Sequence, residues 1–264
     1  MAVVAVPPVT SRREVPPWLR GVFGMVGVVV VWQIVGLTFF SKNNLVPPPT
    51  HILSQMRSDG FAFYWNNART TLHEASIGWL CGNALAVLLA FAFLVAPILE
   101  RPLMRLGIAA YCLPIFAIGP VLQIVFVGQT PKMILAALSV FFTTLVGMLI
   151  GLRSADATTL DLVHAYGGNS FNKLTKVRLR SALPSLFAAL RIAAPAAILG
   201  AIIGEYLGSN NGLGVALIAS EQGLIIDRTW ALALVATALA GIGYGLTALI
   251  GHWLTPWAPK RARV

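Results

Sequence analysis

The residues of this chain that could do chemistry are a few polar side chains set within or beside long apolar stretches. An ionisable group buried in a membrane is costly unless it is paired, so such residues are candidates for a transport pathway or a gate. These polar positions are Gln33, His73, Glu74, Asn83, Gln123, Thr143, Thr144, Arg191 and Glu205. From this set we predict Glu205, Gln123, Thr143 and Thr144 as pathway or gate residues.

Each charged member of the set also has a plainer interpretation. Glu205 ends an apolar stretch beside a segment rich in Gly and Asn, so solvation at the membrane interface fits it as well as a gate role. His73 and Glu74 lie near the end of another stretch, where water can reach them. Arg191 lies about two turns inside its stretch and can extend its guanidinium to the lipid headgroups. The sequence leaves these alternatives open.

Motifs of known catalytic sites are missing from the sequence. No stretch fits G-x-x-x-x-G-K-[ST], so the chain is not predicted to hold ATP by a P-loop. The histidines are scattered, and none belongs to an H-E-x-x-H motif. No two carboxylates share a helix face deep in an apolar stretch. We therefore predict no catalytic residue, no metal and no cofactor on this chain, which is not predicted to be an enzyme.

The composition that surrounds these residues is that of a membrane protein. Of 264 residues, 57% are hydrophobic and only 11% are charged, whereas soluble domains carry about 25% charged residues. A spanning helix needs about 20 apolar residues. We predict an all-α polytopic membrane protein with about six transmembrane helices, at residues 19–40, 70–96, 103–127, 133–152, 183–207 and 229–253.

The distribution of positive charge predicts the orientation and the domains. Most of the 19 lysines and arginines fall in the two tails, the 97–105 turn and the 153–184 segment. Positive residues favour the cytoplasmic side, so we predict both termini and the 153–184 segment there. The net charge of +10 then needs no nucleic-acid partner. The predicted units are a flexible tail (1–18), a six-helix transmembrane domain (19–255) and a basic tail (256–264).

The 153–184 segment is the longest polar stretch and predicts two short helices broken at Gly167-Gly168-Asn169. The first helix is predicted to begin at Thr158, with Asp161 completing a capping box, and the second at Asn169 or Ser170. On the second helix, Lys173, Lys176 and Arg180 share one face, and Phe171 and Leu174 the opposite face. Such a helix fits docking to a partner, and it also fits a connector lying on headgroups.

Pairs of small residues four apart recur within the apolar stretches and predict close helix contacts. The pairs are Gly78/Gly82, Gly147/Gly151, Gly200/Gly204 and Gly241/Gly245. They indicate packing and carry no information on function.

The 153–184 segment resembles the EAA loop of bacterial ABC-importer permeases, whose pattern is E-A-A, three residues, G, nine residues and I-x-L-P. Asp161-Leu162-Val163 corresponds to E-A-A, Gly167 follows at the family spacing, and Val177-Arg178-Leu179 comes nine residues later. Arg180 stands where the family has Pro. Gly204-Glu205, Gly208 and Gly212-Leu213-Gly214 are similar to the nitrate/sulfonate/taurine-type permeases, and the resemblance covers roughly residues 45–255.

The resemblance implies a type I ABC-importer fold and a permease that moves a small solute, such as an anion, sulfonate, carboxylate or vitamin precursor. It implies ABC ATPase subunits carrying ATP and Mg, a solute-binding protein, and a second copy of the permease or a related one. The location would be the bacterial cytoplasmic membrane. The loop residues that would couple to the ATPase are Asp161, Gly167, Gly168, Phe171, Leu174, Val177 and Leu179. The alternative function is a gradient-driven carrier or channel.

Overall fold

The computed structural model describes residues 17–38 and 45–258, and in those ranges it is helical with no strand. The predicted all-α class is confirmed. Of the predicted tails, residues 1–16 and 259–264 lie outside the described residues. The elements are α1 (Pro17–Thr38), α2 (Pro49–Asp59), α3 (Phe61–Val95), α4 (Pro97–Tyr111), α5 (Ile115–Val125), α6 (Thr130–Arg153), α7 (Ala157–Ala165), α8 (Ser170–Asn172), the π-helix η1 (Lys173–Arg178), α9 (Leu179–Gly208), α10 (Leu213–Gln222) and α11 (Ile226–Leu254).

Five helical segments are long and apolar enough to cross a membrane, judged by length and composition. They are α1 (from Leu19), α3, α6, the continuous stretch Ser170–Gly208, and α11. The single span predicted at 103–127 is wrong, because that stretch is divided between α4 and α5. Pro114 causes the division: it has no backbone N–H to donate, and it disfavours helical geometry at Leu113. Pro97 begins α4, so the predicted 97–105 turn is helical instead.

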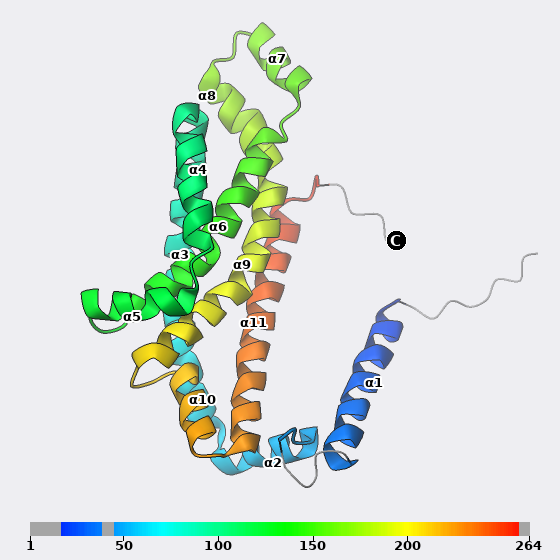
Figure 1. Cartoon of the computed structure of the whole chain (residues 1–264). Coiled ribbons are helices and arrows are strands. Elements are labelled where there is room, and N and C mark those ends of the chain that lie inside the picture. Colours follow the sequence, from blue (N-terminus) through cyan, green and yellow to red (C-terminus); the bar gives the residue numbers. More distant parts are fainter. Residues whose placement is uncertain (1–16, 39–44, 259–264) are drawn as a thin grey trace, which may run out of the picture.

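Helix α6 lies at the centre of the bundle, between α3 and α9 (Figure 1). Glycines allow the backbones to approach closely on both sides. A Cβ built on Gly82 of α3 would lie 2.5 Å from the Ala137 carbonyl oxygen, and one on Gly200 of α9 would lie 2.8 Å from Ala136 Cα. The small-residue contacts predicted for Gly78/Gly82, Gly147/Gly151 and Gly200/Gly204 are therefore confirmed.

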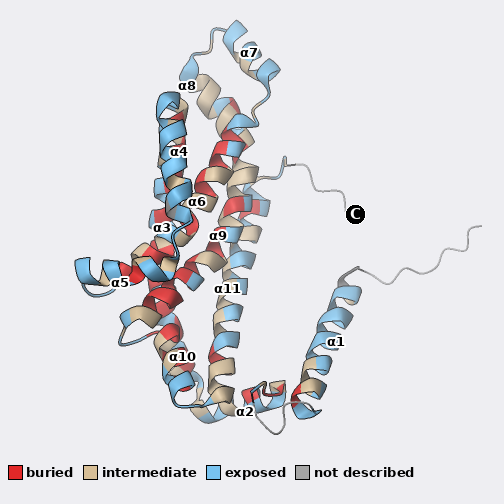
Figure 2. Cartoon of the chain, in the orientation of Figure 1, coloured by how far each residue is buried: buried red, intermediate tan, exposed pale blue. Residues whose placement is uncertain are grey.

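The fourth predicted pair does not make such a contact within the described part of the chain. A Cβ on Gly241 or Gly245 would have no atom within 4 Å. Both glycines lie on an exposed part of α11, and Figure 2 shows that much of α11 and α1 is exposed. The spacing of small residues is the same on a packed and an unpacked face, so the sequence could not separate the two cases.

The ends of α2, α3 and α11 are tied together by one carboxylate. Asp59 accepts hydrogen bonds from Arg228 Nε at 2.9 Å and from the Tyr64 hydroxyl at 2.7 Å. The hydrogen bond from the Arg228 guanidinium holds the pKa of Asp59 below its ordinary value. Nearby, the rings of Trp32 and Trp230 lie 5.6 Å apart and connect α1 to α11. This end of the bundle lies opposite α7 and α8, which project beyond the other helices (Figure 1).

Candidate functional site: a projecting loop and a buried polar cluster

Helix α7 begins one residue earlier than predicted and has a different cap. Asp156 accepts hydrogen bonds from the backbone N–H of Thr159 at 3.0 Å and from its hydroxyl at 2.9 Å. These hydrogen bonds hold the pKa of Asp156 below its ordinary value. The prediction that Thr158 begins the helix and Asp161 completes a capping box is therefore wrong, and Asp161 is exposed on α7.

The turn after α7 requires both glycines, and the predicted break is confirmed. Gly167 has φ +77°, which any side chain with a Cβ adopts only with strain. The Gly168 N–H donates to the Val163 carbonyl at 2.8 Å, and the Gly167 N–H to the His164 carbonyl at 2.9 Å, the two bonds of a Schellman motif. A Cβ on Gly168 would lie 2.6 Å from the Val163 carbonyl oxygen. Asn169 then caps α8 by accepting from the Asn172 N–H at 2.9 Å.

The projecting loop, residues 157–178, carries an exposed apolar face. Phe171 is 68% exposed, Tyr166 85% and Leu162 56%. Tyr166 caps the C-terminus of α7 and is four residues after Leu162, so the two side chains lie on the same side of this helix end. The sequence analysis missed both, although their spacing was a usable signal. We define Leu162, Tyr166 and Phe171 as the loop face.

The remaining apolar residues of the loop anchor it to the bundle. Leu174 and Leu179 pack against a core cluster that α3, α6 and α9 form, and Val177 is 8% exposed. Phe171 and Leu174, which were predicted to share one face, therefore differ in exposure: Phe171 is 68% exposed, whereas Leu174 packs against the core. From Leu174 the loop continues as the π-helical turn η1, closed by the Leu179 N–H donating to the Leu174 carbonyl. This turn has more residues per turn than an α-helix.

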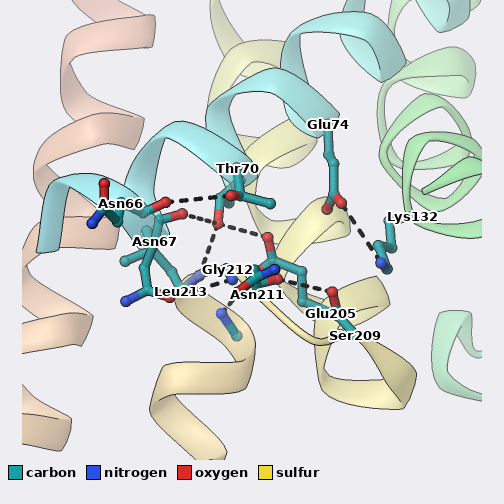
Figure 3. Close-up of polar contacts among 12 residues, drawn as sticks. Asn66, Asn67, Thr70, Glu74, Lys132, Glu205, Ser209, Asn211, Gly212 and Leu213 are labelled. Atoms are coloured by element: carbon teal, nitrogen blue, oxygen red, sulfur yellow. Dashed lines mark hydrogen bonds and ion pairs between the residues drawn. The ribbon is translucent and has the colours of Figure 1, made fainter. Parts of the chain in front are cut away.

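The second candidate site surrounds Glu205 near the C-terminal end of α9, and Figure 3 shows its polar contacts. Glu205 is 1% exposed. Its Oε1 accepts from the Thr71 hydroxyl at 2.7 Å, and its Oε2 accepts from the Gly214 N–H at 2.6 Å. The Thr71 oxygen accepts in turn from the Leu213 N–H at 2.9 Å. The carboxylate therefore holds the first residues of α10 against α3 and α9, where the helix dipole favours a negative charge.

The glycines of the Gly212-Leu213-Gly214 turn bring the backbone against this carboxylate. Gly212 has φ +124°, and a Cβ there would overlap the Glu205 carboxylate. A Cβ on Gly214 would lie 2.6 Å from the Ile202 carbonyl oxygen. In this conformation Glu205 is a structural link between α3, α9 and α10.

Glu74 and Lys132 form an ion pair beside this link. Glu74 is fully buried and Lys132 is 6% exposed, with Lys132 Nζ 3.7 Å from Glu74 Oε1. Both line a cavity of about 660 Å³. The interpretation of Glu74 as a residue at a water-exposed helix end is wrong, because α3 begins well before it, at Phe61, and Glu74 is fully buried. Neither Lys132 nor Thr71 was predicted as a site residue from the sequence, because both acquire partners only through tertiary contacts.

The four predicted pathway residues do not form one site. Gln123 lies beside Gly208, near the Glu205 cluster, since a Cβ on Gly208 would lie 3.0 Å from Gln123 Cδ. Thr144 is fully buried and donates to Asn83 Oδ1 at 2.5 Å, which joins α6 to α3. Twelve residues of α6 separate Thr144 from Lys132, a rise of about 18 Å. Thr143 is half-buried next to it.

A helical bundle with five segments of membrane-spanning length and apolar composition has the architecture of a multi-pass membrane protein. The chain belongs to the family described as "Binding-protein-dependent transport system inner membrane component", which matches residues 82–264. It is thus a member of the type I ABC permeases, which are transport proteins and not enzymes.

Three relatives illustrate the range of this family. The chain is 28% identical to a probable ABC transporter permease protein of Haemophilus influenzae, over 82% of this chain and 89% of the relative. It is 26% identical to the formylaminopyrimidine transport permease protein of Halalkalibacterium halodurans, over 89% and 94%. It is 24% identical to the taurine transport system permease protein of Escherichia coli, over 87% and 86%.

Proposed function

We propose that this chain is the permease subunit of an ATP-driven importer that moves a small solute into the cytoplasm. A solute-binding protein would deliver the solute, and separate ABC ATPase subunits would hold ATP and Mg. A second copy of this chain or a related permease would complete the pathway. The observation that carries the proposal is the loop face, an apolar surface of Leu162, Tyr166 and Phe171 on a part of the chain that projects from the bundle.

The loop is built to pass a displacement to the bundle. Gly167 and Gly168 set the angle between α7 and α8, and Leu174, Val177 and Leu179 fix η1 to the core. From η1 the helix continues without a break into α9, whose 30 residues extend about 45 Å. Its far end carries Glu205. Movement of the loop by an ATPase would therefore act through α9 on the polar cluster at the other end, which supports a coupling role for the loop.

The names of the relatives support a small polar substrate. They include permeases for formylaminopyrimidine and for taurine. For this chain we infer the same broad class: an anion, sulfonate, carboxylate or vitamin precursor of low mass.

The positive charge of the loop end supports an orientation with that end and both termini in the cytoplasm. We expect a cysteine at Asn210 to react with a membrane-impermeant maleimide added to intact cells, and a cysteine at Ser170 to react only after lysis. Both residues are exposed, so burial does not limit the reaction. Labelling of Ser170 in intact cells would contradict the orientation and the cytoplasmic role of the loop.

The function is tested by placing a charge on the loop face. We expect Tyr166→Asp and Phe171→Asp each to reduce ATP-driven uptake more than tenfold at equal amounts of inserted protein, with a parallel loss of ATPase co-purification. Both side chains are exposed, so the bundle should fold normally. The measurement is uptake in vesicles that hold the permease, its ATPase and the binding protein. Leu224→Asp is the matched control, since Leu224 is 82% exposed outside the loop, between α10 and α11.

A change of loop geometry gives an independent arm of the same test. Gly167→Val should strain the turn by about 1–2 kcal/mol and also reduce uptake, whereas Gly167→Asn should retain it, because Asn tolerates positive φ. The proposal would be contradicted if uptake stayed normal in each of three single variants, Tyr166→Asp, Phe171→Asp and Gly167→Val. The loop would then be only a connector, and a gradient-driven carrier would be favoured.

A further inference from the structure

The cavity at the polar end of the bundle has the make-up of a ligand site. It is an open cavity of about 660 Å³, within the size range of small-molecule sites. Every residue in its lining is polar or glycine. The lining residues are Arg69, Thr70, Glu74, Gly128, Gln129, Lys132, Gly208, Ser209, Asn210 and Asn211. Segments that are distant in the sequence meet here, from α3, the α5–α6 turn and the α9–α10 loop.

Glu74 is the unusual member of this lining. It is fully buried, and neither carboxylate oxygen has a donor with good hydrogen-bond geometry among the described residues, although Lys132 and the Glu205 carboxyl lie beside it. Lys132 Nζ is 3.7 Å from Oε1, beyond the usual hydrogen-bond distance. The neighbouring Glu205 has a partner on each oxygen. A buried carboxylate without hydrogen bonds is costly, so Glu74 has unused acceptor capacity at the wall of a cavity.

The charges around the cavity specify the chemistry of a ligand. Lys132 and Arg69 are positive and Glu74 is negative, while the other polar side chains are amides and hydroxyls. Figure 3 shows Glu74 and Lys132 facing one another from α3 and α6. An anion without a positive group would be attracted by the two cations but repelled by Glu74. A cation without a negative group would be attracted by Glu74 but repelled by Lys132 and Arg69. A molecule with both groups matches both signs.

We propose that this cavity binds a small zwitterion, whose acidic group is held by Lys132 and Arg69 and whose ammonium group donates to Glu74. A role of this site in import rests on the proposed function, whereas the binding of a zwitterion to the cavity does not. The zwitterion enters between Glu74 and Lys132, so it replaces their long ion pair by shorter contacts to each partner.

Binding is measured on the full chain in lipid nanodiscs, without ATP or partner proteins, by equilibrium dialysis. The probes are taurine and β-alanine, with ethanesulfonate and propionate lacking the amine and ethylamine lacking the acid. We expect at least one zwitterion to bind at least tenfold more tightly than its partial analogues. No zwitterion binding, or equal binding of a zwitterion and its plain anion, would overturn the proposal.

Three variants assign the roles. Glu74→Gln should remove the preference for the zwitterion over the plain anion, Lys132→Met should abolish binding of both, and Arg69→Gln should weaken both about tenfold. Arg69 is exposed, so binding to Arg69→Gln can be measured even if Glu74→Gln or Lys132→Met fails to fold. Arg57→Gln on α2, also exposed and away from the cavity, is the matched control. Unchanged selectivity in Glu74→Gln would show that Glu74 serves only a structural ion pair, and unchanged affinity in Arg69→Gln would show that Arg69 does not hold the acidic group; either result would overturn the proposal.

The outcomes for binding and for import are separable. Selective binding with no ATP-driven uptake would retain this site and refute the import function. ATP-driven uptake with no zwitterion binding in the cavity would retain the import function and refute this site.

Discussion

Replacement of Glu205 by alanine is expected to release α10 from the bundle. Glu205 joins Thr71 of α3 to Gly214 of α10, and it is 1% exposed. Its removal leaves the Gly214 N–H and the Thr71 hydroxyl without this buried acceptor, and each buried group left unpaired costs about 1–3 kcal/mol. The loss also removes the negative charge that favours the N-terminus of α10. We therefore expect local detachment of α10 and a lower midpoint of thermal unfolding.

Detachment of α10 can be measured with a cysteine at Ser220, which is 3% exposed. In Ser220→Cys alone the thiol should react slowly with maleimide, and addition of Glu205→Ala should accelerate the reaction at least tenfold. Glu205→Gln, which keeps one acceptor oxygen, should be intermediate. Glu221→Ala is the control, because Glu221 is an exposed carboxylate on the same helix. Equal reaction rates in the Glu205→Ala and Glu221→Ala backgrounds would contradict the structural link.

Replacement of Gly200 by leucine is expected to disrupt the centre of the bundle. A Cβ at Gly200 would already lie 2.8 Å from Ala136 Cα and 2.8 Å from the Leu135 carbonyl oxygen, both backbone atoms of α6. Backbone cannot move aside as a flexible side chain can, so α6 and α9 must separate. Overpacking of a core costs about 1–3 kcal/mol or more. We expect loss of monodisperse protein or a large fall in the unfolding midpoint.

The matched comparison is Gly241→Leu on α11. Both substitutions replace a helical glycine by a better helix former, but a Cβ at Gly241 has no atom within 4 Å. The unfolding midpoint of the Gly241→Leu permease in detergent should stay close to that of the parent. If the two variants unfolded at the same temperature, the close approach of α6 and α9 would not be what holds the bundle together.

Several features of this protein follow from the sequence alone. The long apolar runs predict membrane-length helices, because transfer of apolar side chains from water dominates their free energy. The break at Gly167-Gly168-Asn169 was predictable because Gly and Asn supply the backbone geometry and the cap that end one helix and begin the next. Three of the four small-residue pairs also marked real helix contacts.

Other features were decided only by the tertiary structure. Hydropathy counts residues over a window, so it did not register that Pro114 divides the 103–127 stretch into α4 and α5. Local periodicity grouped Leu174 with Phe171, and only the packing of the loop against the core decided that Leu174 is covered while Phe171 stays exposed. Thr71 and Glu205 are 134 residues apart, and only the packing of α3 against α9 and α10 brings them together. Side-chain partners at such separations depend on how the helices pack, which no local pattern of polar and apolar residues encodes.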